Sequence, residues 1–247
     1  TITPDREYAK RGDTVSVDLS LSSEIEDLKS FEVSVKASDS LNNEIDAYTL
    51  SADASGLTTD TSFTFVVPES AEIGSMISIE VTATDAVDGE FSEMGEMEVV
   101  SYFSVFRANA SMGHKFSTFI NRGYNLVDAI EVYNDAPNNT KDMVDNSTDK
   151  GPLSKTVSAN NASNTEFVNL GNSYDISGLH SGNVEEIFAE RNASTVAGVE
   201  TGTNLLAKCR GGAKYVLVVF SNVDGDFQHR NEEDNTGIYE FDIYQTK

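Results

Sequence analysis

The sequence predicts an all-β protein built from two tandem β-sandwich domains, residues 1–100 and 101–247, the second with long polar loops and one short helix. Apolar and polar side chains alternate through many short segments, which Gly, Pro, Asp and Asn separate, as in antiparallel sandwiches. The 247 residues are enough for two domains with separate cores. Composition also changes near residue 100. Residues 1–100 hold 22 acidic residues, 5 basic residues and two asparagines, whereas residues 101–247 hold 19 acidic residues, 12 basic residues and eighteen asparagines. A domain boundary is therefore expected there.

The first domain is predicted to contain a series of strands. Alternating apolar residues mark segments 15–21, 31–37, 63–67 and 77–83, and residues 97–99 form a closing strand. Turn-forming residues follow the fourth segment at 85–89. Apolar residues continue without a linker through 99–106, so the last strand of this domain is expected to lead directly into the next domain.

The second domain is predicted to mix strands with long loops. Strands are expected at residues 102–106, 116–120, 126–133, 153–157 and 203–209. Polar residues and two prolines fill 134–164, which indicates surface loops. Residues 183–191 form the best helix candidate, because Val184, Ile187 and Phe188 share one face and acidic residues come early.

A hairpin near the C-terminus organises the second domain. Residues 214–220 hold six consecutive apolar residues rich in β-branched Val, which predicts a central strand buried on both faces. In residues 238–244 apolar side chains alternate with acids, which predicts a strand with one face in water. The connecting loop, 221–237, is longer than most hairpin loops, and such loops often carry function. This loop is the first candidate site.

The charge of the chain limits the classes of partner. A formal net charge of −24 argues against nucleic acid and anionic membranes, which are held by Lys and Arg, and favours cations. No segment is long and apolar enough to be a transmembrane helix. The single cysteine, Cys209, excludes an internal disulfide, and its alternation with Leu205 and Ala207 predicts a packed core thiol instead of a nucleophile.

Oxygen-bearing side chains in the hairpin loop follow the spacing of a calcium-binding loop. Positions 1, 3, 5, 7 and 12 of that register hold Asn222, Asp224, Asp226, Gln228 and Glu233. Calcium is therefore the candidate cofactor. Phe227 occupies position 6, where such loops need glycine, and Gly225 comes one place early. The alternative is an ordinary acidic hairpin loop.

Two further groups of oxygen-bearing residues have the same ambiguity. They are Asp142, Asp145, Asn146 and Asp149, and Asp85, Asp88 and Glu90. Either group could bind a cation, but in so acidic a chain a solvated turn is the commoner arrangement.

Sugar binding would require exposed rings near the loops. The chain has no Trp, and the rings in or beside the loops of the second domain belong to Tyr124, Tyr133, Tyr174, Phe227 and His229. The alternative for each is a core or cross-strand position. No catalytic residue is predicted, because the three histidines lie far apart in sequence and no nucleophile or phosphate-binding motif is present.

Two stretches resemble a known group of proteins. Residues 63–89, with a Pro-initiated loop, a Gly and a strand that ends in Thr84-Asp85, resemble the end of an immunoglobulin-like domain of bacterial surface proteins. Residues 108–129, the acids near Asp142 and the final hairpin are similar to the C-terminal sandwich of secreted or lipid-anchored proteins of Bacteroidetes-type bacteria. The resemblance implies an immunoglobulin-like first domain and a secreted or outer-surface location, with lipid anchoring through a removed N-terminal leader. It carries over no functional residue.

These observations predict a non-enzymatic binding or adhesion protein whose ligand is a glycan or another cell-surface protein. One alternative is a structural spacer of a surface assembly, which would show no pocket but a large exposed apolar patch or edge strand. Another is a glycan-active hydrolase on the second sandwich, which would show two facing carboxylates, one with a raised pKa.

Overall fold

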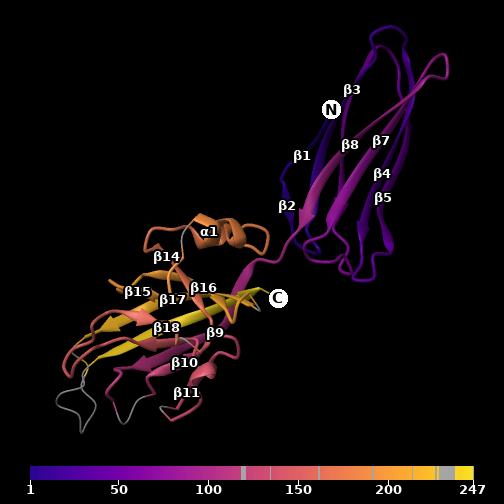
Figure 1. The fold of residues 1–247 in the computed structure, drawn as a ribbon. Coiled ribbons are helices and arrows are strands. Elements are labelled where there is room, and N and C mark those ends of the chain that lie inside the picture. The colour runs from indigo at the N-terminus through magenta and orange to yellow at the C-terminus, as the bar shows by residue number, and fades with distance from the viewer. Residues whose placement is uncertain are drawn as a thin grey trace. The chain divides into compact units, whose positions relative to one another are not determined.

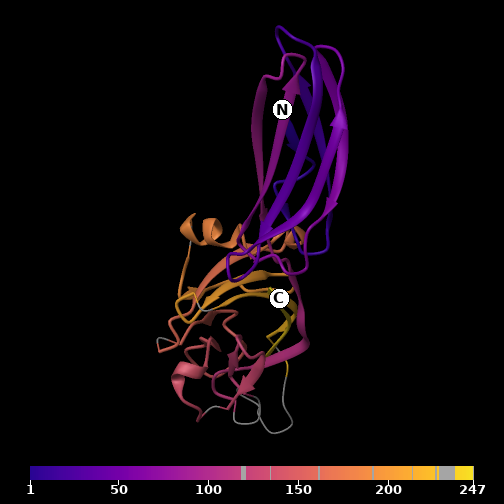
Figure 2. The same ribbon diagram turned by 90° about the vertical axis from the view of Figure 1, so that its right-hand side faces the viewer.

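The computed structural model describes residues 1–117, 121–133, 135–160, 162–190, 192–212, 214–225, 227 and 237–246. Strands make up most of this part of the chain, which confirms the all-β prediction. The chain divides into two compact units, Thr1–Ser101 and Tyr102–Lys247. Figures 1 and 2 show the strands of each unit from two directions.

The first unit is a sandwich of two sheets. Its strands are β1 Ile2–Pro4, β2 Tyr8–Ala9, β3 Thr14–Ser22, β4 Leu28–Ser38, β5 Glu44–Asp53, β6 Thr58–Val66, β7 Met76–Asp85 and β8 Glu90–Val99. One sheet has the order β1-β3-β6 and the other β2-β8-β7-β4-β5. The N-terminal segment contributes to both sheets, because β1 pairs antiparallel with β3 whereas β2 pairs parallel with β8.

Alternation produces the core of the first unit. The predicted apolar positions of β3, β4, β6 and β7 are buried and form a single cluster. The structure adds β5, which the alternation did not reveal. A bulge opposite Val35 and Lys36 inserts one residue into β5, so its apolar residues change phase after Ala47. The alternation of apolar and polar residues is therefore interrupted within β5, although the strand packs on the core.

The second unit also contains two sheets. Its strands are β9 Phe103–Gly113, β10 Gly123–Asn125, β11 Ile130–Val132, β12 Met143–Asp145, β13 Val157–Ser158, β14 Glu166–Gly171, β15 Thr195–Val196, β16 Asn204–Cys209, β17 Lys214–Asp224 and β18 Ile238–Thr246. Two 3₁₀ turns, η1 Asn138–Thr140 and η2 Ile176–Gly178, and one helix, α1 Val184–Glu190, lie between them. The larger sheet has the order β14-β16-β17-β18-β9 and the smaller β11-β10-β12-β13-β15.

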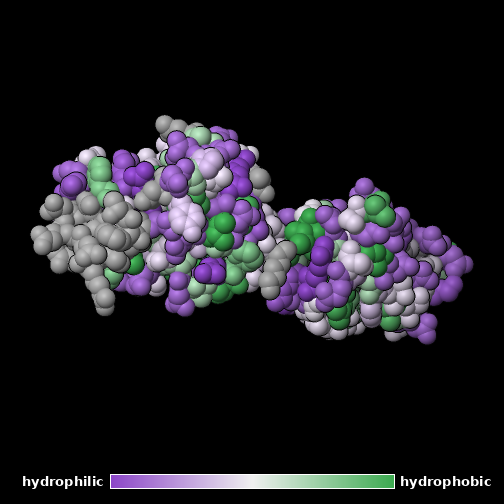
Figure 3. All heavy atoms as spheres, turned by 90° about the horizontal axis from the view of Figure 1, so that it is seen from below, coloured by the Kyte–Doolittle hydropathy of each residue, from purple (hydrophilic) through white to green (hydrophobic). Residues whose placement is uncertain are grey.

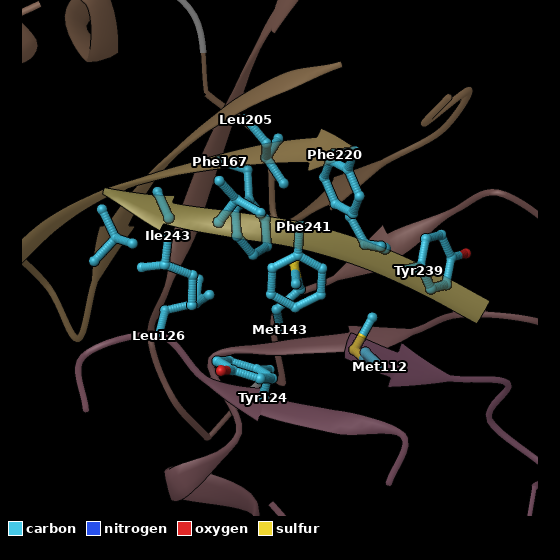
Figure 4. Close-up of a cluster of buried hydrophobic side chains, with 14 of the residues drawn as sticks. Met112, Tyr124, Leu126, Met143, Phe167, Leu205, Phe220, Tyr239, Phe241 and Ile243 are labelled. Carbon is cyan, nitrogen blue, oxygen red and sulfur yellow. The ribbon is translucent and has the colours of Figure 1, made fainter. Parts of the chain in front are cut away.

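The strand β17 is central and buried on both faces, as predicted. Val216, Val218 and Phe220 belong to the cluster between the two sheets, and Figure 4 shows part of that cluster. Leu217 belongs to a second cluster on the opposite face, with Phe188 of α1. In Figures 1 and 2, α1 lies on one side of the larger sheet and β10 and β11 on the other. The larger sheet is thus the middle layer of the unit.

The helix predicted at 183–191 is confirmed as α1. A charged contact attaches it to the sheet: the ammonium of Lys208 lies 3.1 Å from a Glu185 carboxylate oxygen, and the Tyr215 hydroxyl donates a hydrogen bond to Glu185. The Tyr215 hydrogen bond, followed by Lys208, lowers the pKa of Glu185. Lys208 also lies 6.0 Å from the centre of the Phe188 ring.

Two predicted strands of the second unit differ from the structure: of the strand predicted at 126–133 only Ile130–Val132 forms, as β11, and the described part of 116–120 is not a strand. Residues 126–129 form a turn between β10 and β11, because the Asn125 side chain accepts from the Asp128 amide at 3.0 Å and donates to its carboxylate at 2.7 Å. Local side-chain bonds of this kind compete with a strand. Residues 115–117 also turn, with the Phe116 amide donating to His114 Nδ1 at 3.1 Å, and 118–120 lie outside the described residues.

We expect Phe241→Ala to destabilise the second unit by about 3–5 kcal/mol, because the substitution empties a fully buried site between the sheets. The Phe241 ring lies 5.0 Å from the Tyr124 ring and 5.6 Å from the Phe220 ring. Cys209 reports this unit, since its thiol is fully buried in the same cluster and burial raises its pKa. The measurement is the rate at which a thiol reagent labels Cys209 as denaturant increases.

The matched control is Val105→Ala on β9, because Val105 is 53% exposed. It should change the free energy of unfolding obtained from the labelling by less than about 1 kcal/mol. Equal effects of the two substitutions would contradict the described packing.

Candidate functional site

The proposed calcium register is described only in part. Asn222 and Asp224 belong to β17, where they pair with Glu240 and Ile238 of β18. The Asn222 amide nitrogen donates to the Glu240 carboxylate at 2.8 Å. Asp226, Gln228 and Glu233 lie outside the described residues. In the part of the chain that the structure covers, no group of three or more His, Cys, Asp or Glu side chains is arranged to hold a metal ion. Calcium in this loop stays a prediction.

The rings proposed for sugar stacking lie in different environments. For Tyr124 the core alternative holds: it faces the core from β10 (Figure 4) and is 1% exposed, and its hydroxyl donates to the Ala129 carbonyl at 3.0 Å. Tyr174 is half-buried against the cluster beneath α1. Tyr133 is 72% exposed and Phe227 37%. His229 lies outside the described residues. None of the described rings lines the pocket identified below.

Asp142 is buried in a hydrogen-bonded network, so the solvated-turn interpretation is wrong for it. Its carboxylate accepts from the Leu126 amide at 3.0 Å and the Thr165 hydroxyl at 3.1 Å. It also forms an ion pair with Arg210 at 3.2 Å, and Arg210 donates to Asn125 at 2.9 Å. The network connects the turn after β10 to the turn after β16.

Asp145 is buried as well, at 1% exposure. One carboxylate oxygen accepts from the Tyr239 hydroxyl at 3.0 Å and the Ser147 hydroxyl at 3.1 Å. The other accepts from the Lys115 amide at 2.7 Å. Tyr239 belongs to the larger sheet and Asp145 to the smaller, so this carboxylate joins the two layers.

The third acidic group is a turn, as expected. Asp85 accepts from the amides of Val87 at 3.0 Å and Gly89 at 2.7 Å, which is a side chain closing its own loop. Asp88 pairs with Lys29 at 2.6 Å. These contacts give Asp85 and Asp88 partners within the protein.

A pocket of about 350 Å³ lies on the smaller sheet of the second unit. Its floor follows from strand register: Gly123 pairs with Val144, Val144 with Ser158, and Ser158 with Thr195. Their neighbours Tyr124, Met143, Val157 and Val196 face the core. Since side chains alternate along a strand, the row formed by Val144, Ser158 and Thr195 faces away from the core.

The walls of the pocket are polar and basic. The remaining lining residues are Lys115, Arg122, Asn138, Lys141, Asp145, Asn146, Ala159 and Asn160. Three of the twelve basic residues in 101–247 therefore meet at one site. Among the lining residues, Asp145 is the single carboxylate, and both its oxygens already accept hydrogen bonds from the protein.

Backbone contacts hold two of these cations in place. Arg122 Nη1 donates to the Lys115 carbonyl at 2.8 Å, while Asp145 accepts from the Lys115 amide. The Asp145 amide donates in turn to the Arg122 carbonyl at 3.3 Å. The segments that carry Lys115 and Arg122 are therefore fixed against β12.

Gly123 makes room for the third cation. A Cβ atom at Gly123 would lie 3.1 Å from Cγ and 3.2 Å from Cδ of Lys141, so the Lys141 stem occupies the place of the missing side chain. Lys141 is 4% exposed. Burial, and then the positive charge of Arg122, lower its pKa, which the charge of Asp135 partly offsets. The charge of Arg122 therefore disfavours the charged form of Lys141, whereas an anion beside Lys141 would favour it.

The polar lining defines the kind of ligand that the pocket can hold. Amide side chains can donate and accept, and hydroxyls can do both, so the lining matches a ligand rich in hydroxyl groups. Its volume is at the lower end of the usual range for small-ligand pockets, about 300–1,000 Å³. Sequence reasoning singled out Asp145 and Asn146 but missed the pocket, because its residues come from five separated segments. The one available signal was the enrichment of Lys, Arg and Asn after residue 100.

Comparison with known proteins gives distant structural similarities. No protein-family model and no curated protein sequence matches the chain. A DUF4466 family protein from Parabacteroides merdae is similar over 100% of this chain and 99% of its own, with 9% identity and a TM-score of 0.37. The sporulation control protein Spo0M from Bacillus subtilis is similar over 40% of this chain and 47% of its own, with 11% identity and a TM-score of 0.32.

A β-glucuronidase from Bacteroides uniformis is similar over 45% of this chain and 14% of its own, with 12% identity and a TM-score of 0.30. All three TM-scores are low, so these proteins indicate no function for this chain. In the described ranges, no helix has the length and apolar character required to cross a bilayer.

We expect Asp142→Ala to destabilise the second unit by about 2–4 kcal/mol, because it leaves Arg210, the Leu126 amide and the Thr165 hydroxyl without their buried acceptor. The reference substitution is Asp149→Ala, since Asp149 is exposed. That substitution should change the free energy of unfolding by no more than about 0.5 kcal/mol. Denaturant unfolding followed by Cys209 labelling measures both, and a neutral Asp142→Ala would mean that the network contributes no stability.

Proposed function

We propose that this protein is a non-enzymatic binding or adhesion protein, secreted or held at the outer cell surface, that binds part of a glycan in the pocket on the smaller sheet. The observation that carries the proposal is the pocket itself, a polar depression on a sheet floor whose lining includes three Asn residues, Ser158, Thr195 and three basic residues. Glycan hydroxyl groups need such mixed donors and acceptors.

Two features of the floor favour a preformed site. Val144, Ser158 and Thr195 belong to paired strands, and strands hold a constellation more accurately than loops do. The walls are held by the hydrogen bonds of Asp145 and Arg122 to the Lys115 segment. A preformed site loses less entropy on binding.

The pocket argues against a hydrolase as the alternative. Glycosidases of the usual kind need two carboxylates on opposite sides of the bond to be cleaved. The described lining holds one, Asp145, and its oxygens accept hydrogen bonds from Lys115, Ser147 and Tyr239. A carboxylate held in this way supports the structure of the site.

We further propose that the first unit is an immunoglobulin-like spacer. The strand orders β1-β3-β6 and β2-β8-β7-β4-β5, with the first strand divided between the sheets, support this. A purely structural role for both units is less favoured. Hydrophobic residues on the face in Figure 3 form small separate groups, and the edge strand β9 is interrupted by bulges that hinder pairing with another chain.

A pair of adjacent asparagines tests the location of the glycan site. We expect Asn138→Ala to weaken glycan binding about five- to tenfold, the worth of roughly one hydrogen bond, because Asn138 lines the pocket. Asn139→Ala should leave binding unchanged, since Asn139 is exposed on the same 3₁₀ turn but is not a lining residue.

The measurement is a glycan array on the full chain, followed by titration of each variant with the strongest array ligand. An array without any bound glycan would overturn the proposed function. An equal loss of glycan affinity in both variants would show that the glycan binds outside this pocket.

A further inference from the structure

The charge of the pocket identifies a class of ligand. We propose that the pocket binds the anionic group of an acidic sugar, either the carboxylate of a uronic acid or a sulfate ester, between Lys115, Arg122 and Lys141. This inference rests on the proposed function and names the substrate class for the same site.

Three basic residues line one pocket although the chain as a whole is acidic. Residues 101–247 contain 19 acidic and 12 basic side chains, so a random surface depression would be lined by more acids than bases. This pocket is lined by three basic residues and one acid, Asp145. Asp145 is buried, and its oxygens bond to the Lys115 amide, the Tyr239 hydroxyl and Ser147. Its charge is used inside the protein, beneath the pocket.

Lys141 is held in a defined position at the pocket. Only 4% of the residue is exposed. Its stem lies in the space that Gly123 leaves open. Burial and the charge of Arg122 lower its pKa, and a bound anion would reverse both influences by favouring the charged form.

The geometry around Lys115 and Arg122 suits an anion. Arg122 presents a planar guanidinium, which recognises carboxylate and sulfate oxygens through paired N–H groups. Its Nη1 donates to the Lys115 carbonyl at 2.8 Å, and both residues line the pocket. The surrounding Asn138, Asn146 and Asn160 would bond to sugar hydroxyls next to the anionic group.

The net charge of −24 does not prevent anion binding at the pocket. At physiological ionic strength the Debye length is about 8 Å, so distant acids are screened whereas contacts inside a partly buried pocket are screened much less. The expected preference is therefore a contact effect and should persist at about 0.15 M salt.

The experiment compares three ligands on the full chain by calorimetric titration at that salt concentration: methyl galacturonide, galactose 6-sulfate and the neutral methyl galactoside. We expect at least one acidic sugar to bind about tenfold or more tightly than the neutral one, the magnitude of a charge-assisted hydrogen bond. The better of the two acidic sugars distinguishes a carboxylate from a sulfate ligand.

Substitutions then assign the preference to the pocket. Lys141→Met keeps the stem over Gly123 and removes the charge, and Arg122→Gln removes the guanidinium. Both should reduce the acidic preference to less than about threefold, while Lys150→Gln, an exposed lysine outside the pocket lining, should leave it intact. Folding of each variant is checked by the protection of the Cys209 thiol against labelling. If either of the first two variants is unfolded, Lys115→Gln provides a third variant.

The outcomes separate the two proposals. Equal affinity for acidic and neutral sugars would overturn the anionic inference and leave glycan binding standing. An acidic preference that survives all three pocket substitutions would also overturn it, since the cations would then lie elsewhere. No binding of any of the three sugars, together with a blank glycan array, would overturn the proposed function itself.

Discussion

Burial of strand β17 on both faces is the constraint on which the second unit depends. Val216 and Val218 face the smaller sheet and Leu217 faces the cluster beneath α1, so the larger sheet must have a covering layer on each side. The helix supplies one layer and the smaller sheet the other. The smaller sheet has its other face turned away from the core, as the row of Val144, Ser158 and Thr195 shows. The pocket lies on that face.

The strands of the smaller sheet are two or three residues long, and they provide few backbone hydrogen bonds. Buried carboxylates supply part of what is missing. Asp142 connects two turns through Arg210 and Thr165, and Asp145 connects the two sheets through Tyr239. Because both carboxylates are paired with several donors, their burial is compensated. The same Asp145 fixes the Lys115 segment, so a core interaction also determines the shape of the site.

The basic pocket and the acidic chain serve different requirements. Acidic residues spread over the surface favour solubility and keep copies of the protein apart. A local excess of cations, in contrast, creates a site that discriminates by charge at contact distance. The stem of Lys141 over Gly123 shows how the fold holds a basic residue there: the apolar part of the side chain packs against the strand, and the residue lines the pocket.

Local pattern was sufficient for much of the architecture. Side-chain direction repeats every two residues in a strand and about every 3.6 in a helix. The buried face could therefore be predicted from the alternation in β3, β4, β6 and β7, from the apolar run in β17 and from the spacing in α1. The prediction failed where one residue breaks the repeat, as at the bulge in β5, or where a side chain bonds to its own backbone, as Asn125 does before the turn after β10.

The site depended on the tertiary structure. Sequence alone determined the all-β class, the central hairpin, the acidity of the chain and the burial of Cys209. Only folding decided that Tyr124 faces the core, that Asp142 and Asp145 are internal, and that Lys115, Arg122 and Lys141 meet over one sheet. The physical reason is distance along the chain: these residues come from separate segments, and their meeting is set by the packing of the whole unit, which no local repeat encodes.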